Sequence, residues 1–254
     1  MTLLRPISSD PIAIRQALER GWATFASCPW VLMGFTLVGG GVNLLSQVLY
    51  RYESDRFIGL FGRVDGLAIA LAGAAWLAYA LSSLWLLVGL MRGAQMALGR
   101  QSPRFSDLVR LDGRAMARCL GTLVLILALN ALIVRLAQAS AFLLTLIQPW
   151  LAPLPLVAGV AVAVYLAADQ ILCLPLTLMG QLTPLGAFRS GRAAIDPHWL
   201  QALGLTLVVI LILLAGFLVL LVGLVAALPI TICTLAAAYE QLFELPDLNR
   251  PRPT

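Results

Sequence analysis

The residue with the clearest chemical potential is Asp169, a carboxylate inside a long apolar segment. Gln170 follows it, and Asn130 lies at a comparable estimated depth in another apolar segment. A carboxylate near the bilayer centre costs about 2.5–3.5 kcal/mol, so it normally faces a partner or a cavity. Together they predict an intramembrane polar site for a proton or a ligand. The alternatives are a packed polar pair, or an Asp169 closer to the inner membrane surface.

A second candidate site is a stripe of arginines in a polar gap between apolar segments. Its members are Arg104, Arg110, Arg114 and Arg118. Basic residues at a membrane surface attract anionic lipid head groups, at about 1 kcal/mol each. The same residues would also determine membrane topology, and the two roles are compatible.

Other residue types argue against an enzyme or a metal protein. His198 is the single histidine, and the four cysteines are scattered in or beside apolar segments, without metal-ligand spacing. No G-x-S-x-G nucleophile elbow occurs. We therefore predict no catalytic residue, cofactor or metal ligand. Arg135, near the end of its apolar segment, is expected to snorkel to the membrane interface; its pairing with Asp169 would require a different depth.

Composition indicates which elements must position these residues. The 254-residue chain is 61% hydrophobic and only 11% charged, with a mean hydropathy of +0.93. Soluble domains carry about 25% charged residues. The net charge of +5 is carried by arginines in short gaps, rather than by a polar domain of the kind that binds nucleic acid. The sequence therefore predicts one integral membrane domain over residues 1–254.

Six apolar segments reach the length of about 20 residues that a spanning helix needs. They cover residues 30–49, 66–91, 119–138, 156–178, 200–221 and 224–243. The last two run together, and we divide them near Gly223, because one helix of that length would overshoot the bilayer. The predicted fold class is an all-α membrane bundle with six transmembrane helices.

The arginines also predict an orientation. With the N-terminus inside, 13 of the 17 basic residues fall in cytoplasmic segments, and three in an outside loop. Cytoplasmic loops hold the excess of Lys and Arg in membrane proteins. Both termini are therefore expected in the cytoplasm, with the protein in a plasma (inner) membrane or an internal membrane.

Each cytoplasmic segment opens with a cap residue followed by proline, at Asp10, Ser102 and Thr183. Such pairs begin helices. An amphipathic stretch and an apolar hairpin follow each pair. We predict cytoplasmic amphipathic interfacial helices and a threefold repeat of interfacial helix and hairpin. Simple alternation in any bundle with an even number of helices would explain the same pattern.

Three runs resemble a known group of proteins: GRQSPRFSDLVR from Gly99, LTPLGAFRSGR from Leu182, and LPITICTLAAAYEQLF from Leu228. They are similar to a broad group of uncharacterised bacterial six-helix integral membrane proteins. That group includes domain-of-unknown-function families and the membrane domain of some glycerophosphodiester phosphodiesterases. The resemblance implies the architecture and no functional residue. This chain lacks the soluble phosphodiesterase domain, so that activity does not transfer.

These observations favour a non-enzymatic membrane protein that organises membrane partners or lipids. Its expected partners are membrane lipids and other membrane proteins, with no nucleic acid and no metal. The alternative is a small-solute transporter or channel that uses Asp169 with Asn130. An enzyme acting on lipid ranks third, since the sequence displays no site for it.

Overall fold

The computed structural model describes residues 12–58 and 66–243, and within these ranges every regular element is a helix. Six helical stretches are long and apolar enough to cross a membrane. They are Pro29–Ser54, Gly66–Leu98, Gly113–Ile147, Pro149–Asp169, Pro184–Leu218 and Gly223–Leu242. These stretches support the predicted all-helical, multi-pass membrane protein.

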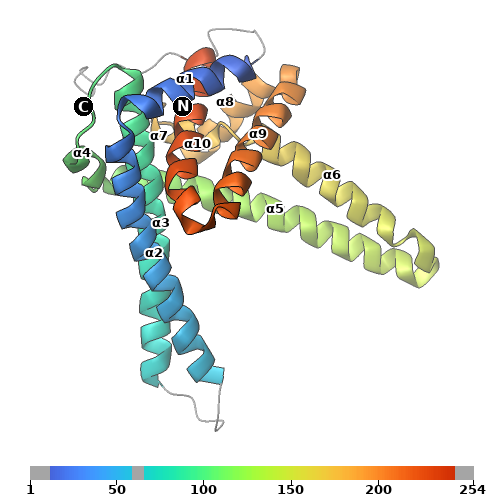
Figure 1. Ribbon diagram of the computed structural model, residues 1–254. Coiled ribbons are helices and arrows are strands. Elements are labelled where there is room, and N and C mark those ends of the chain that lie inside the picture. Colours follow the sequence, from blue (N-terminus) through green and yellow to red (C-terminus); the bar gives the residue numbers. More distant parts are fainter. Residues whose placement is uncertain (1–11, 59–65, 244–254) are drawn as a thin grey trace.

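The long helices pair into three antiparallel hairpins (Figure 1). Helix α2 (Pro29–Ile58) pairs with α3 (Gly66–Leu98), and α5 (Gly113–Ile147) pairs with α6 (Pro153–Asp169). The third hairpin joins α9 (Trp199–Leu218) to α10 (Leu220–Leu242). The first two hairpins project in different directions from a common packed region, and the third lies between them.

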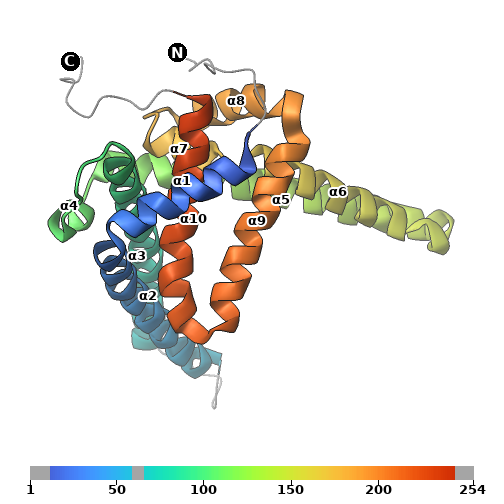
Figure 2. The ribbon, with the colours of Figure 1, turned by 45° about the horizontal axis from the view of Figure 1, so that its top comes forward.

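Short elements gather at the end where the hairpins converge (Figure 2). The short elements are α1 (Ile14–Ser27), α4 (Phe105–Val109), α7 (Cys173–Leu178), α8 (Pro184–Ile195) and the 3-10 turns η1 (Pro149–Leu151) and η2 (Asp196–His198). Of these, only η1 lies elsewhere, because it forms the turn between α5 and α6. The convergent end is therefore the one place where many chain segments meet.

Helix α10 is the centre of the packing, in contact with α1, α2, α3 and α9. In its second half three consecutive alanines, Ala236, Ala237 and Ala238, are at 0% exposure. Small side chains let neighbouring helices approach closely in membrane proteins. The far part of the α5/α6 hairpin is the opposite case, since Leu146 and Ile147 are at least 70% exposed. Such bare apolar surface suits lipid rather than water.

The predicted fourth span, 156–178, is broken in the structure. Helix α6 ends at Asp169, and α7 begins at Cys173 after a short turn. Pro175 explains the break, because proline has no N–H for the Ile171 carbonyl and its ring would clash with that carbonyl in a continuous helix. Hydropathy does not predict this helix break, because the segment is apolar on both sides of it.

The boundary between the last two spans also differs from the predicted one. Helix α9 ends at Leu218 and α10 begins at Leu220, so the chain turns at Val219 and not near Gly223. Gly223 instead faces Gly216 across the hairpin, where a Cβ on Gly216 would lie 3.0 Å from the Gly223 carbonyl oxygen. This glycine permits a close helix contact and does not make the turn.

The predicted cap residues have three different outcomes. Thr183 caps α8, accepting a hydrogen bond from the Gly186 N–H at 3.3 Å. Ser102 does not cap α4, which begins at Phe105 with Arg104 as its N-cap residue. The Asp107 carboxylate accepts the Arg104 N–H at 3.0 Å and so takes over the capping role. Asp10 lies outside the described residues.

Candidate functional site

A cavity of about 830 Å³ opens at the convergent end, between α3, α4, the start of α5 and the loop after α7. Its charged lining residues are Arg92, Asp107, Arg110, Asp112, Arg114 and Arg118. Apolar side chains, including Val88, Met91 and Leu178, complete the wall. The cavity therefore joins an excess of positive charge to an apolar surface.

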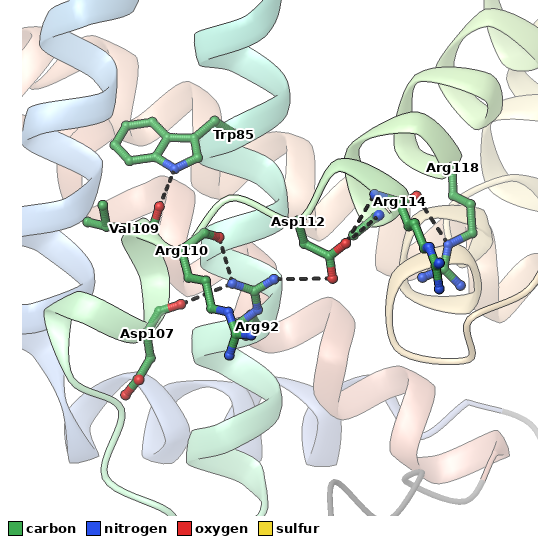
Figure 3. Close-up of polar contacts among 9 residues, drawn as sticks. Trp85, Arg92, Asp107, Val109, Arg110, Asp112, Arg114 and Arg118 are labelled. Atoms are coloured by element: carbon green, nitrogen blue, oxygen red, sulfur yellow. Dashed lines mark hydrogen bonds and ion pairs between the residues drawn. The ribbon is translucent and has the colours of Figure 1, made fainter. Parts of the chain in front are cut away.

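Arg92 holds the loop that forms one wall of the cavity (Figure 3). Its guanidinium donates to the backbone carbonyls of Asp107 at 3.1 Å and Arg110 at 2.8 Å. The same group pairs with the Asp112 carboxylate at 3.6 Å, and both side chains are largely buried. Arg92 is thus a structural clamp whose charge is already compensated.

Asp112 links this clamp to the first turn of α5. Its Oδ1 accepts the backbone N–H groups of Arg114 and Ala115, each at 3.1 Å. An aspartate at this position satisfies N–H groups that would otherwise have no partner, and it stabilises the helix start. The capped turn determines where the arginines of α5 begin.

The remaining arginines carry charge that no acidic group in the described chain neutralises. The side chains of Arg110 and Arg114 make no hydrogen bond or ion pair with any described residue, and Arg118 donates only to the Arg114 carbonyl at 3.4 Å. Arg114 and Arg118 are four residues apart on α5, so their side chains lie on one helix face. These three guanidinium groups are available to an external anion.

Two residues with unusual backbone conformations lie beside this cavity. Arg100 and Gln181 have φ values of 57° and 53°, and they are the only non-glycine residues with positive φ in the described ranges. Gln181 lines the cavity, and Arg100 precedes Gln101, which also lines it. Left-handed backbone costs a non-glycine residue free energy and is concentrated at ligand-binding sites.

The structure brings together three of the four predicted arginines, namely Arg110, Arg114 and Arg118. Arg104 is exposed at the start of α4 and is not among the lining residues. The clamp formed by Arg92 and Asp112 was not anticipated. The signal for it was a single arginine near the end of an apolar segment, followed after about 20 residues by an aspartate at a helix start.

Asp169 lies at the end of a span, and not inside one as the sequence suggested. It is 2% exposed, and Gln170 beside it is 5% exposed. Asn130 donates to the Ile126 carbonyl of its own helix at 2.9 Å, and no hydrogen bond among the described residues joins it to Asp169 or Gln170. The three predicted residues therefore do not form one hydrogen-bonded site.

Two other expectations concern Arg135 and metal binding. Arg135 is exposed well before the end of α5, because that helix continues to Ile147 instead of ending near Gln138. Within residues 12–58 and 66–243, no group of three or more His, Cys, Asp or Glu side chains could hold a metal ion. The arginine cavity is therefore the best-formed candidate site in this part of the chain.

Comparison with known proteins adds no further constraint. No family model, curated protein or solved structure matches this chain.

Proposed function

We propose that this is a non-enzymatic integral membrane protein that organises lipids and membrane partners, and that it binds the phosphate of anionic phospholipids in the arginine cavity. The supporting observation is the set of three arginines without acidic partners, Arg110, Arg114 and Arg118, beside an apolar wall. Arginine suits phosphate because its planar guanidinium donates several hydrogen bonds. The apolar wall suits the first carbons of an acyl chain.

The proposed orientation puts the cavity at the cytoplasmic surface, with both termini on that side. An excess of arginine in the short segments supports this orientation. Helices α1 and α8 would lie at the membrane interface, because each buries one face and exposes polar residues on the other. In α1 the buried residues are Ala17, Gly21, Thr24 and Phe25, while Arg15 and Glu19 form an exposed pair.

The threefold repeat remains part of the proposal. Helices α1, α4 and α8 each precede one of the three hairpins, in the order that such a repeat requires. Helix α4 has only five residues, which makes it the most divergent unit. A bacterial plasma or internal membrane is proposed from the sequence resemblance alone.

The test compares two triple variants that remove the same charge. In the purified full chain, Arg110, Arg114 and Arg118 are changed to Gln in one variant. In the control variant, the exposed residues Arg15, Arg104 and Arg189, which lie outside the cavity lining, are changed instead. Binding of fluorescent phosphatidylglycerol and phosphatidylcholine is measured, with inorganic phosphate as competitor.

The cavity variant should bind phosphatidylglycerol roughly a hundredfold more weakly, at about 1 kcal/mol per lost arginine. The control should change far less. Equal losses in both variants would point to diffuse surface charge and overturn the proposal. Displacement by phosphate at a similar concentration would identify free phosphate as the ligand, and phosphatidylcholine should not compete.

A small-solute transporter or channel built on Asp169 and Asn130 ranks second. It requires the two side chains to serve one solute, whereas the Asn130 amide donates within its own helix. Flux through proteoliposomes that Asp169→Asn abolishes would support it. Absence of solute-dependent flux in the unmodified protein would remove its basis.

A further inference from the structure

The break between α6 and α7 contains a concentration of buried polar groups. The turn is held by backbone hydrogen bonds from Gln170 to Leu166 at 2.9 Å and from Cys173 to Gln170 at 3.0 Å. Among the described residues, no N–H group donates a hydrogen bond to the main-chain carbonyl of Asp169. Interrupted helices in membrane proteins often direct such free carbonyls at a bound cation.

Three side chains near this break are buried without a partner in the described chain. They are Asp169, Gln170 and Ser190, each at most 5% exposed. Asp169 Oδ1, Gln170 Nε2 and Ser190 Oγ have no hydrogen-bond partner. Buried polar atoms nearly always have one, so these orphans indicate a bound species that satisfies them.

Helix α8 packs against the break at Gly191. A Cβ on Gly191 would lie 3.9 Å from the Asp169 carbonyl oxygen and 3.7 Å from Cys173 Sγ. Ser190 is the neighbour of Gly191 and belongs to the same buried face of α8. Helix α8 therefore lies against the free carbonyl of Asp169, with a buried serine next to the point of contact.

The charged groups around Asp169 sum to one negative charge, from two carboxylates (Asp169 and Asp196) and one guanidinium (Arg192). Asp169 interacts electrostatically with Asp196, Arg192, Tyr165 and Cys173. Arg192 pairs with Asp196 at 3.3 Å, and the Tyr165 hydroxyl donates to Asp196 at 2.6 Å. Arg192 is thus paired with Asp196, and Asp169 makes no ion pair with a described residue.

We propose that a small monovalent cation of the size of Na⁺ binds at this break, held by the Asp169 carboxylate and the Ser190 hydroxyl with main-chain carbonyls of the turn. Gln170 can add an oxygen ligand if its amide is turned, because the two amide orientations are difficult to distinguish. One surplus charge suits a monovalent ion, whereas Ca²⁺ sites usually contain several carboxylates. The bound ion would tie α6 and α7 to α8.

The experiment follows thermal unfolding of the purified full chain in NaCl, LiCl, KCl and choline chloride at equal ionic strength. The intrinsic fluorescence of the six tryptophans follows unfolding of the whole chain. NaCl should raise Tm with the logarithm of its concentration above Kd, by on the order of 5 °C at tenfold above Kd. Asp169→Asn should abolish this response, and Ser190→Ala should raise the NaCl concentration at which Tm begins to rise about tenfold.

The matched control is Glu19→Gln, which removes an exposed carboxylate on α1 and should keep the sodium response. If Asp169→Asn does not fold, Ser190→Ala and ²³Na line broadening by the unmodified protein decide the question. An equal effect of choline chloride, or an unchanged NaCl concentration for the onset of the Tm rise in Ser190→Ala, would overturn the proposal and leave water as the occupant. The variant without Arg110, Arg114 and Arg118 should keep the response, so the lipid and cation proposals fail separately.

Discussion

The arginines at the cavity differ in whether their charge is paired within the protein. Arg92 uses its guanidinium on two carbonyls and one carboxylate of the same chain. Arg110 and Arg114 have no such contacts among the described residues. A compensated arginine stabilises the fold, whereas an uncompensated one at a cavity is available for binding an anion.

Arg92→Gln should therefore destabilise the loop, and any effect on ligand binding should follow from that loss. Loss of a charged donor to two carbonyls should lower stability by about 1–3 kcal/mol. Thermal unfolding and protease cleavage between residues 99 and 112 are the measurements. Arg92→Lys should recover only part of the stability, because an ammonium group cannot reproduce the planar fork. Arg110→Gln is the control, and equal destabilisation by it would contradict the clamp.

The cysteines act as packing residues. Cys119, Cys173 and Cys233 are buried, and Cys28 is partly buried. Burial, followed by the nearby Asp169 charge, raises the pKa of Cys173 to about 12. Its thiol therefore stays protonated and unreactive at neutral pH.

At the scale of elements, the two ends of α5 differ in their surroundings. The first turns pack into the convergent end, where Thr122 and Thr177 share a hydrogen bond at 2.9 Å. The second half pairs with α6, and a Cβ on Gly159 would lie 2.7 Å from that of Ala137. At 1.5 Å per residue, the 35 residues of α5 extend about 52 Å, well beyond the hydrocarbon core of about 30 Å. The helix therefore serves both the cavity and the membrane span.

The contact between α1 and α10 depends on a glycine. A Cβ on Gly21 would lie 2.6 Å from the Cα of Thr234, which is too close for any side chain. Gly21→Ala should therefore separate the two helices, at a cost of about 1–3 kcal/mol. Thermal unfolding and protease access to α1 measure the effect.

Gly34→Ala is the matched control, because nothing lies within 4 Å of a Cβ at that position of α2. It should be neutral or stabilising by up to about 1 kcal/mol. Similar destabilisation by the two variants would show that helix propensity and not the close contact explains the result.

At the scale of the whole molecule, the packing is uneven. The short helices lie at one end, from which the hairpins project (Figures 1 and 2). The cavity lies at that end, and the hairpins carry mostly apolar, exposed surface away from it. This arrangement of the elements predicts that the loop before α4 and the turn after α5 are on opposite sides of the membrane.

Single cysteines test this topology in a background where the four native cysteines are replaced. Ser102→Cys, before α4, should react with an impermeant maleimide only in inverted vesicles. Gln148→Cys, after α5, should react in intact cells. Labelling of both from the same side would contradict the six-span topology, and exchange of the two sides would reverse the proposed orientation.

The sequence by itself determined the number of apolar segments and the uneven distribution of arginine. Both depend on local composition, because a span needs only enough consecutive apolar residues and a topology signal only enough charge in a loop. It also predicted Arg110, Arg114 and Arg118 as one group, because they are close in sequence.

Only the tertiary structure decided which of these features lie together. Asp169 was placed inside a span, because hydropathy cannot detect the break before Pro175 or the cover provided by α8. The Arg92 clamp requires a loop to fold back on the end of α3. A glycine is required at position 21 because Thr234, more than 200 residues later, packs against it. Contacts between distant segments depend on how the helices pack, and local composition does not encode that arrangement.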